Sequence, residues 1–311
     1  MTKNIKILGH RGVRNRLLYG ENTLSAFEYA LSTADGIEAD VVLSRDGVPY
    51  LLHDTAIRFI PYVASAVFTT WRKNVDAMSW DLVGGRDFYE MHSSEVDEIL
   101  LKSGDDIPRL SDLFALMSRH NGGKRKTINL ELKAPESARP VLEAIDLAEK
   151  KDQIDRGQII ISSFDHNEIA MVQKIDPSMR TGLIFWHDSV RPCRLYPRRE
   201  KYLSQALPIS IKNLEDEKIR RILPDYFVLP AKGLTAAYND ALAQEYPKAK
   251  IIVWTPGSEP LPLPSRNKVL FEKLSDPAIC PRIAAIITNH PEEMKGRFCG
   301  APDKPAPHDP F

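Results

Sequence analysis

The stretch GIEADVVLSRDGVPYLLHD, residues 36–54, decides how the chain is interpreted. It predicts a strand, a turn at residues 45–47 and a second strand that leads to His53. Glu38 and Asp40 share one face of the first strand because alternate residues of a strand point the same way. If the strands pair, His53 returns toward both carboxylates. Carboxylates are rarely buried without a partner, so the stretch predicts a metal site or an acid/base site. The alternative is a solvated strand face with a histidine at its end.

Segments with strand character alternate with helical segments along the chain. The strands lie near residues 6, 37, 128, 159, 181, 225, 251 and 285. This alternation predicts a TIM (β/α)8 barrel, and a doubly wound open sheet is the alternative. A TIM barrel carries its functional residues at the carboxyl ends of its strands. The polar and aromatic residues at such ends are His10, Glu38, Asp40, Glu131, Lys133, Ser163, Trp186 and Trp254.

The same pattern gives the domain organisation. We expect residues 1–299 to form a single barrel domain, in which residues 55–107 are an insertion or lid after the second strand. We expect residues 300–311 to form a Pro-rich C-terminal tail.

Local signals predict several helix boundaries. Ser111 is expected to cap a helix, and Asp165 with Glu168 resembles a capping box. Residues 213–223 are expected to form one helix, and residues 277–282 belong to the last helical segment.

Composition excludes several classes of function. The chain has 42 basic and 42 acidic residues and a formal net charge of zero, so no nucleic-acid partner is expected. No apolar run is long enough to span a bilayer, and no stable membrane insertion is expected. The N-terminus does not resemble a signal peptide, and three scattered cysteines argue against a disulfide framework or a zinc site. We therefore expect a cytoplasmic protein, and its oligomeric state stays open.

The segment TINLELK, residues 127–133, adds a third carboxylate. Asn129, Glu131 and Lys133 share one strand face, which points into the predicted barrel. Carboxylates that converge repel one another unless a cation or protons lie between them. Hard oxygen ligands suit Mg²⁺ or Ca²⁺. A divalent cation, with Lys133 and Arg11 as fixed positive charges, is suited to an anionic phosphoryl group.

These motifs together resemble the glycerophosphodiester phosphodiesterase family. The matching pieces are HRG at 10–12, ENT at 21–23, E-x-D at 38–40, HD at 53–54, NLELK at 129–133, SSF at 162–164, VWT at 253–255 and IITNHP at 286–291. Each piece alone is weak, whereas the ordered set is specific. The resemblance implies a TIM barrel that hydrolyses glycerophosphodiesters to sn-glycerol 3-phosphate and an alcohol with the help of one divalent cation.

The resemblance also implies a role for individual residues. It makes Glu38, Asp40 and Glu131 the metal ligands, and it makes His10 and His53 the general base and general acid. It assigns Arg11 to the phosphate, and Lys133 follows the third carboxylate. Imidazoles titrate near neutrality and suit both proton transfers. The nucleophile is either water or the glycerol hydroxyl of the substrate.

The chain departs from the family pattern at three places. Gly20 stands where Pro commonly precedes ENT, residues 55–62 differ after HD, and Asn289 replaces an Asp. None of these changes removes a metal ligand or a catalytic histidine. The second and third changes leave the contacts to the alcohol group open.

Other residues carry weaker signals. Glu21 either orients Arg11 or precedes a helix, while Trp254 and Phe164 are expected to pack the barrel and line the pocket, with substrate stacking as the alternative. The residues expected on the surface or in loops are His166, His187, His290 and the Arg-rich stretch 191–201.

Two alternative functions remain. One is a lysophospholipase D or sphingomyelinase D-like phosphodiesterase on the same barrel. The other is a non-catalytic module that binds phosphodiesters, although binding alone would not require both histidines.

Overall fold

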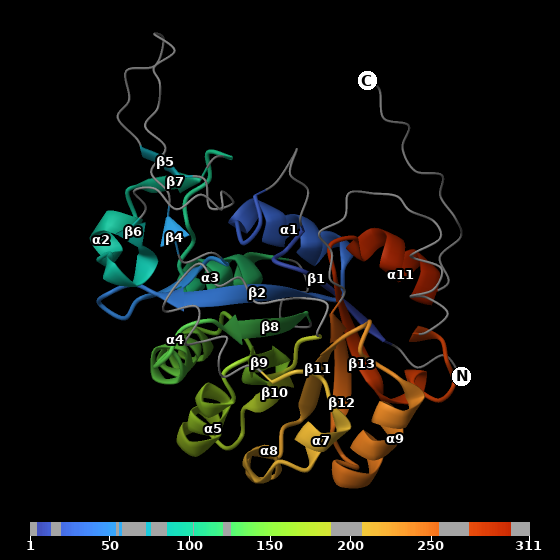
Figure 1. Cartoon of the computed structure of the whole chain (residues 1–311). Coiled ribbons are helices and arrows are strands. Elements are labelled where there is room, and N and C mark those ends of the chain that lie inside the picture. Colours follow the sequence, from blue (N-terminus) through green and yellow to red (C-terminus); the bar gives the residue numbers. More distant parts are fainter. Residues whose placement is uncertain are drawn as a thin grey trace.

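The protein folds as a closed parallel barrel with helices on its outside (Figure 1). The computed structural model describes residues 5–13, 20–53, 56–57, 73–75, 86–101, 103–120, 126–187, 207–254 and 274–299. The barrel strands are β1 (Lys6–Gly9), β2 (Gly36–Leu43), β8 (Thr127–Leu132), β9 (Ile159–Ser163), β10 (Arg180–Ile184), β11 (Tyr226–Pro230), β12 (Lys250–Trp254) and β13 (Ile283–Thr288). Pairing of β1 with β2 closes the ring, which confirms the predicted TIM barrel.

The outer layer consists of helices that connect successive strands, and of α11 after the last strand. These helices are α1 (Leu24–Thr33), α3 (Leu110–Arg119), α4 (Ala138–Lys150), α5 (His166–Ile175), α7 (Ile211–Leu214), α8 (Glu217–Ile222), α9 (Ala236–Glu245) and α11 (Pro291–Cys299). Single 3₁₀ turns, η3 (Arg156–Gln158) and η4 (Cys280–Arg282), precede β9 and β13. Among the described helices, none combines the length and the apolar character that crossing a bilayer requires.

The two faces of β2 explain why its carboxylates point inward. Ile37, Ala39 and Val41 belong to the large core cluster that also contains Phe27 and Leu31 of α1, so this face packs against the helices. The opposite face lies in the barrel. A separate apolar cluster drawn only from strands fills much of that interior: Leu8, Ile160, Ile184, Val228, Ile252, Ala285 and Ile287.

The predicted hairpin is present. β2 pairs antiparallel with β3 (Pro49–Leu51), and Val41 lies opposite Leu51. The turn between them is held because the hydroxyl of Ser44 donates to Asp46 and the amide of Val48 donates to that hydroxyl. On its other edge β2 pairs in parallel with β8, so the hairpin joins the barrel to the insertion.

The insertion contributes short elements outside the barrel. They are β4 (Ala56–Ile57), β5 (Lys73–Val75), β6 (Arg86–Asp87), η1 (Phe88–Glu90), α2 (Ser93–Val96) and β7 (Ile99–Leu101). Its described C-terminal part packs on the hairpin through a small core with Val42, Tyr50 and Phe88. The carboxylate of Asp46 accepts hydrogen bonds from the amide and hydroxyl of Ser93. This part is thus fixed against the barrel.

Three helix boundaries differ from the sequence-based expectation. Arg109, not Ser111, is the N-cap of α3, because Asp112 accepts a hydrogen bond from the Arg109 amide at 2.9 Å. The helix expected over 213–223 is broken into α7 and α8, since Asp216 begins a new helix by accepting from the Lys218 amide. The last described helix is α11, beyond the 277–282 segment that was expected to be last.

Of the capping box expected at α5, the part played by Asp165 is present and the part expected of Glu168 is not. Asp165 is the N-cap and accepts from the Asn167 amide at 2.9 Å. Glu168 instead accepts from the amides of Glu136 at 2.7 Å and Ala138 at 3.0 Å, at the beginning of the neighbouring helix α4. The carboxylate therefore holds the loop that follows β8, and its partners are 32 and 30 residues away in sequence.

Glu168→Ala is expected to lower the free energy of unfolding by about 1–3 kcal/mol, because two backbone amides, of which that of Ala138 is buried, lose their acceptor. Chemical denaturation of both proteins measures this. Glu168→Gln is the matched control, because its carbonyl oxygen can still accept one hydrogen bond, and we expect a smaller loss. Equal stability of Glu168→Ala and the parent protein would show that the loop does not depend on this carboxylate.

Candidate active site

Three carboxylates converge at the carboxyl end of the barrel, on the neighbouring strands β2 and β8. Asp40 lies opposite Glu131 in the strand register, and Glu38 lies opposite Asn129. One oxygen from each of Glu38, Asp40 and Glu131 lies within 4.8 Å of the others. Glu38 and Asp40 are buried, with exposed fractions of 2% and 1%. The structure therefore brings together the three acidic residues that the sequence suggested.

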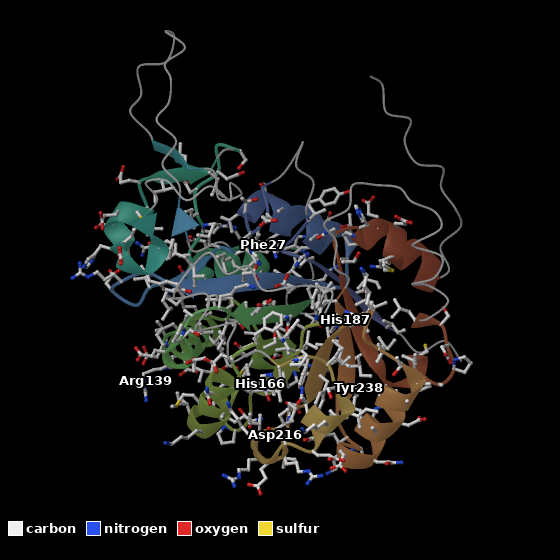
Figure 2. All side chains as sticks on the ribbon, viewed as in Figure 1. Phe27, Arg139, His166, His187, Asp216 and Tyr238 are labelled. Atoms are coloured by element: carbon white, nitrogen blue, oxygen red, sulfur yellow. The ribbon has the colours of Figure 1, made fainter. Side chains whose placement is uncertain are left out.

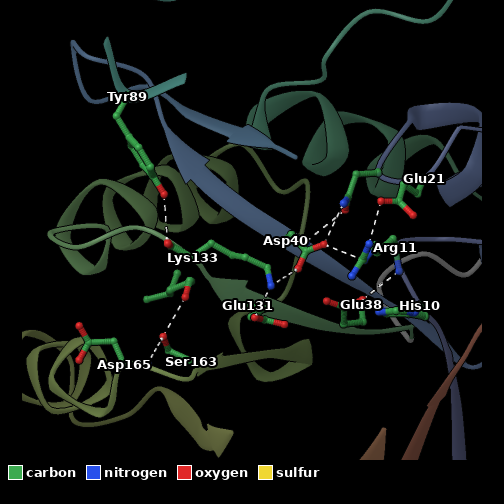
Figure 3. Close-up of polar contacts among 12 residues, drawn as sticks. His10, Arg11, Glu21, Glu38, Asp40, Tyr89, Glu131, Lys133, Ser163 and Asp165 are labelled. Atoms are coloured by element: carbon green, nitrogen blue, oxygen red, sulfur yellow. Dashed lines mark hydrogen bonds and ion pairs between the residues drawn. The ribbon is translucent and has the colours of Figure 1, made fainter. Parts of the chain in front are cut away.

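Two fixed cations face these carboxylates (Figure 3). The Lys133 ammonium donates to Glu131 Oε1 at 2.6 Å and forms an ion pair with Asp40 Oδ1 at 3.1 Å. Arg11 Nε lies 3.1 Å from Asp40 Oδ2, and the Arg11 backbone amide donates to Glu38 at 2.9 Å. Lys133 thus contacts one oxygen of Asp40, and Arg11 contacts the other.

The environment separates the pKa values of the two buried carboxylates. Burial raises the pKa of Glu38 well above its usual range, and repulsion by Asp40 and Glu131 adds to this effect. Burial also disfavours the charged form of Asp40, but Lys133 and Arg11 outweigh it and hold the pKa of Asp40 below its usual range. Of these two carboxylates, Asp40 is therefore the more firmly ionised.

His10 directly follows β1 and is held by one defined hydrogen bond. Its Nδ1 lies 2.7 Å from Asn289 Oδ1, and its Nε2 lies 3.9 Å from Glu38 Oε2. Because an amide oxygen only accepts, Nδ1 carries the proton and Nε2 remains able to accept one. Burial, with the nearby charge of Arg11, lowers the pKa of His10 to about 3. His10 is thus neutral at pH 7.

His53 lies two residues beyond β3, at the end of the hairpin, and is half-buried. The amide of Leu52 donates to the carbonyl of Asp40 at 3.1 Å, which ties this end of the hairpin to β2. Besides burial and Arg11, the charge of His53 lowers the pKa of His10, and His53 also contributes to the low pKa of Asp40. His10 and His53 therefore both lie close enough to Asp40 to interact with its charge.

The turn that carries Arg11 requires an unusual backbone. Arg11 and Gly12 have φ values of 54° and 79°, in the left-handed region. A Cβ atom on Gly12 would lie 2.7 Å from the backbone carbon of Ala26, so only glycine fits beneath α1. The HRG motif thus positions a histidine and an arginine side by side over the end of β1.

Two residues of the site were missed as functional candidates. Asn289 had been noted only as a departure from the family pattern, yet it holds His10. Asn22 was matched only as the middle residue of the ENT piece, and the cap of α1 is Thr23. The side chain of Asn22 contacts Asp40 instead. Glu21 forms an ion pair with Arg11 at 2.7 Å, which favours the first of its two expected roles.

His166 was wrongly expected on the surface. It is 1% exposed and begins α5 (Figure 2). Its Nε2 lies 3.1 Å from the carbonyl oxygen of Ile184, and its ring tilts against Phe185. Burial lowers the pKa of His166 to about 4, so it is a neutral packing residue. Phe164 and Trp254 pack against the apolar cluster inside the barrel, as expected.

His187 and His290 are partly buried and lie outside regular elements. The Arg-rich stretch 191–201 lies outside the described residues, as does much of 55–62 and the whole of 300–311.

The donor set fits a divalent cation. Glu21, Glu38, Asp40 and Glu131 surround Arg11 and Lys133, so four carboxylates face two cations and leave two negative charges when all are ionised. Among the described residues, Glu38 Oε1 and Asp40 Oδ1 are buried and accept no hydrogen bond. Two oxygens that bind the same Ca²⁺ lie at most about 5 Å apart, and the three oxygens of the cluster lie within that limit. Glu38, Asp40 and Glu131 could therefore hold such an ion.

A TIM barrel with a carboxylate cluster, fixed cations and two imidazoles defines a class of enzymes that act on anionic phosphate esters. The sequence model of the Glycerophosphoryl diester phosphodiesterase family matches residues 10–207. The chain belongs to this family, and it is an enzyme, a phosphoric diester hydrolase.

Known relatives are distant in sequence but similar in fold. A glycerophosphodiester phosphodiesterase of Caldanaerobacter subterraneus subsp. tengcongensis is 27% identical over 197 residues, which cover 63% of this chain and 73% of that protein. The structure of a glycerophosphodiester phosphodiesterase from Parabacteroides distasonis superposes with a TM-score of 0.64 at 15% identity and covers 97% of this chain and 100% of that one. An Oleispira antarctica phosphodiesterase in complex with sn-glycerol-3-phosphate has a TM-score of 0.57 at 14% identity, with 95% and 97% covered.

Proposed function

We propose that the protein hydrolyses glycerophosphodiesters to sn-glycerol 3-phosphate and an alcohol, with a divalent cation and with His10 and His53 as the proton-transfer pair. The observation that carries the proposal is the meeting of three carboxylates and two fixed cations beside these histidines. The product named for the Oleispira antarctica structure supports this choice of substrate class. We also propose that residues 1–299, including the insertion, form one catalytic domain.

Each side chain has a defined task in this proposal. Glu38, Asp40 and Glu131 hold the cation, Mg²⁺ or Ca²⁺, which supplies Lewis-acid stabilisation of charge on the phosphoryl oxygens. Arg11 and Lys133 supply fixed positive charge at the same place. The oxygen of the nucleophile forms a bond to phosphorus, and the bond between phosphorus and the alcohol oxygen breaks.

Two proton transfers accompany this cleavage. One histidine removes the proton of the nucleophile, and the other donates a proton to the leaving oxygen. His10 suits the first task because its Nε2 is the nitrogen that can accept a proton. His53 then takes the second.

The first test is a substrate panel. Glycerophosphocholine and glycerophosphoethanolamine are expected to release sn-glycerol 3-phosphate with Mg²⁺, Ca²⁺ or Mn²⁺, and EDTA is expected to stop the release. A coupled assay for sn-glycerol 3-phosphate measures this, and restored activity after excess metal controls for damage by EDTA. Lysophosphatidylcholine and sphingomyelin complete the panel. Preference for these acylated substrates would contradict the proposal and support a lysophospholipase D-like enzyme, whereas no turnover of any ester would support a binding module.

A further inference from the structure

Asn22 lies between the turn of Arg11 and the strand of Asp40, and it is 1% exposed. Its Nδ2 donates to Asp40 Oδ2 at 2.9 Å, and its Oδ1 accepts from the Asp40 backbone amide at 3.1 Å. Its own backbone amide donates to the carbonyl of Arg11 at 3.0 Å. One residue thus binds both the side chain and the backbone of Asp40 and joins them to the Arg11 turn.

These contacts give the two oxygens of Asp40 different surroundings. Oδ2 accepts the Asn22 hydrogen bond and pairs with Arg11 Nε at 3.1 Å. Oδ1 accepts no hydrogen bond among the described residues and lies 3.1 Å from Lys133 Nζ, on the side of the carboxylate cluster. Rotation of the carboxylate would break the bond with Asn22. The amide therefore fixes the plane of the Asp40 carboxylate, with one oxygen held by Asn22 and Arg11 and the other on the side of Lys133.

We propose that Asn22 is a positioning residue that orients Asp40 for the divalent cation, an inference that rests on the proposed metal-dependent function. Partners that orient a metal ligand commonly change metal affinity or activity by about 10–100-fold when they are removed. Asn22 is 1% exposed and acts through its two hydrogen bonds to Asp40. It also fixes the distance between Arg11 and Asp40, since it bonds to both.

The backbone of Asn22 dictates which variants are informative. Its φ is 58°, in the left-handed region, where asparagine, aspartate and glycine are tolerated and most other residues are strained. Asn22→Gly keeps this backbone and removes the side chain. Asn22→Asp keeps the shape and one acceptor but lacks the Nδ2 donor, and it places a carboxylate against Asp40 Oδ2.

The experiment is Mn²⁺ binding to the full chain, measured by the loss of the free-ion EPR signal and by calorimetry. Asn22→Gly is expected to weaken Mn²⁺ binding about 10–100-fold. Thr23→Ala is the matched control: it removes the cap of α1 in the same loop, where Thr23 accepts from the Ala26 amide, but it does not contact Asp40. We expect this control to bind Mn²⁺ as the parent protein does.

Each outcome decides the inference. Equal Mn²⁺ affinity of Asn22→Gly and the parent overturns the role of Asn22 and leaves the proposed function intact. Equal weakening in Asn22→Gly and Thr23→Ala also overturns it, since loop disruption then explains the loss. No Mn²⁺ binding by the parent overturns the metal proposal together with this inference. If Asn22→Gly does not fold, Asn22→Asp takes its place, and unchanged affinity in that variant is the contrary result.

Discussion

Glu131→Gln is expected to lower kcat/KM by about three orders of magnitude and to abolish tight binding of a divalent cation. The substitution keeps the size of the side chain but removes one of three charges that converge within 4.8 Å. It also removes the charge that Lys133 contacts at 2.6 Å. The ammonium is then freed to pair more closely with Asp40, which competes with the cation. Loss of several kcal/mol of charge stabilisation corresponds to a factor of about 10³ in rate.

Activity against glycerophosphocholine and Mn²⁺ binding by calorimetry test this prediction. Glu217→Gln is the matched control, because Glu217 has the same chemistry but its side chain is 81% exposed and pairs with Arg221 on the surface of α8. We expect this control to be unchanged in both measurements. Full activity of Glu131→Gln in the presence of EDTA would overturn the assignment of the carboxylates as metal ligands.

The parts of the fold that the sequence predicted are those whose signal is local. The strand GIEADVV places carboxylates at alternate positions in an apolar run, and this pattern suffices to predict a strand with one polar face. TINLELK has the same pattern. Because both strands are parallel neighbours in a barrel, their polar faces had to meet.

The parts that sequence reasoning missed depend on contacts between distant loops. His10 and Asn289 are 279 residues apart, and no local pattern shows that one would hold the other. Asn22 lies 18 residues from Asp40, and its motif is also a normal helix start. The spacing of Glu168 fits a capping box, yet its carboxylate accepts hydrogen bonds from the amides at the beginning of α4 instead. The partners of such residues can be identified only when the closed barrel is known.

The contact between the insertion and the site also could not be predicted from the sequence alone. The hydroxyl of Tyr89 donates to the carbonyl of Lys133 at 3.1 Å, which brings η1 to the end of β8 (Figure 3). The hydroxyl of Tyr50 on β3 donates to Asp97 at 2.7 Å, and this bond fixes the base of the same segment. The segment 88–101 therefore packs beside Lys133. Its low sequence periodicity gave no sign of this.

His10→Ala is the second change with a large expected effect. We expect kcat to fall by about 10²–10⁴-fold, because a positioned proton-transfer group contributes about that factor. Affinity for sn-glycerol 3-phosphate, measured by calorimetry in the presence of metal, is expected to stay within a few-fold, since Arg11, Lys133 and the carboxylates remain. This combination distinguishes an enzyme from a binding module, in which removal of His10 changes no rate.

The control for His10→Ala is His92→Ala, which removes an imidazole whose side chain is 55% exposed and whose Nδ1 lies 3.4 Å from Asp46 on the hairpin turn. It is expected to retain kcat.

His53→Ala is expected to resemble His10→Ala if the two rings divide the two proton transfers. Where the leaving group needs no proton, as with a nitrophenolate ester, the histidine that acts as the general acid becomes dispensable. Recovery of His53→Ala but not of His10→Ala on such an ester would assign the acid to His53 and the base to His10, in agreement with an Nε2 of His10 that can accept a proton. The reverse recovery would exchange the two roles, and loss of binding in either variant would show that the ring holds substrate instead of moving a proton.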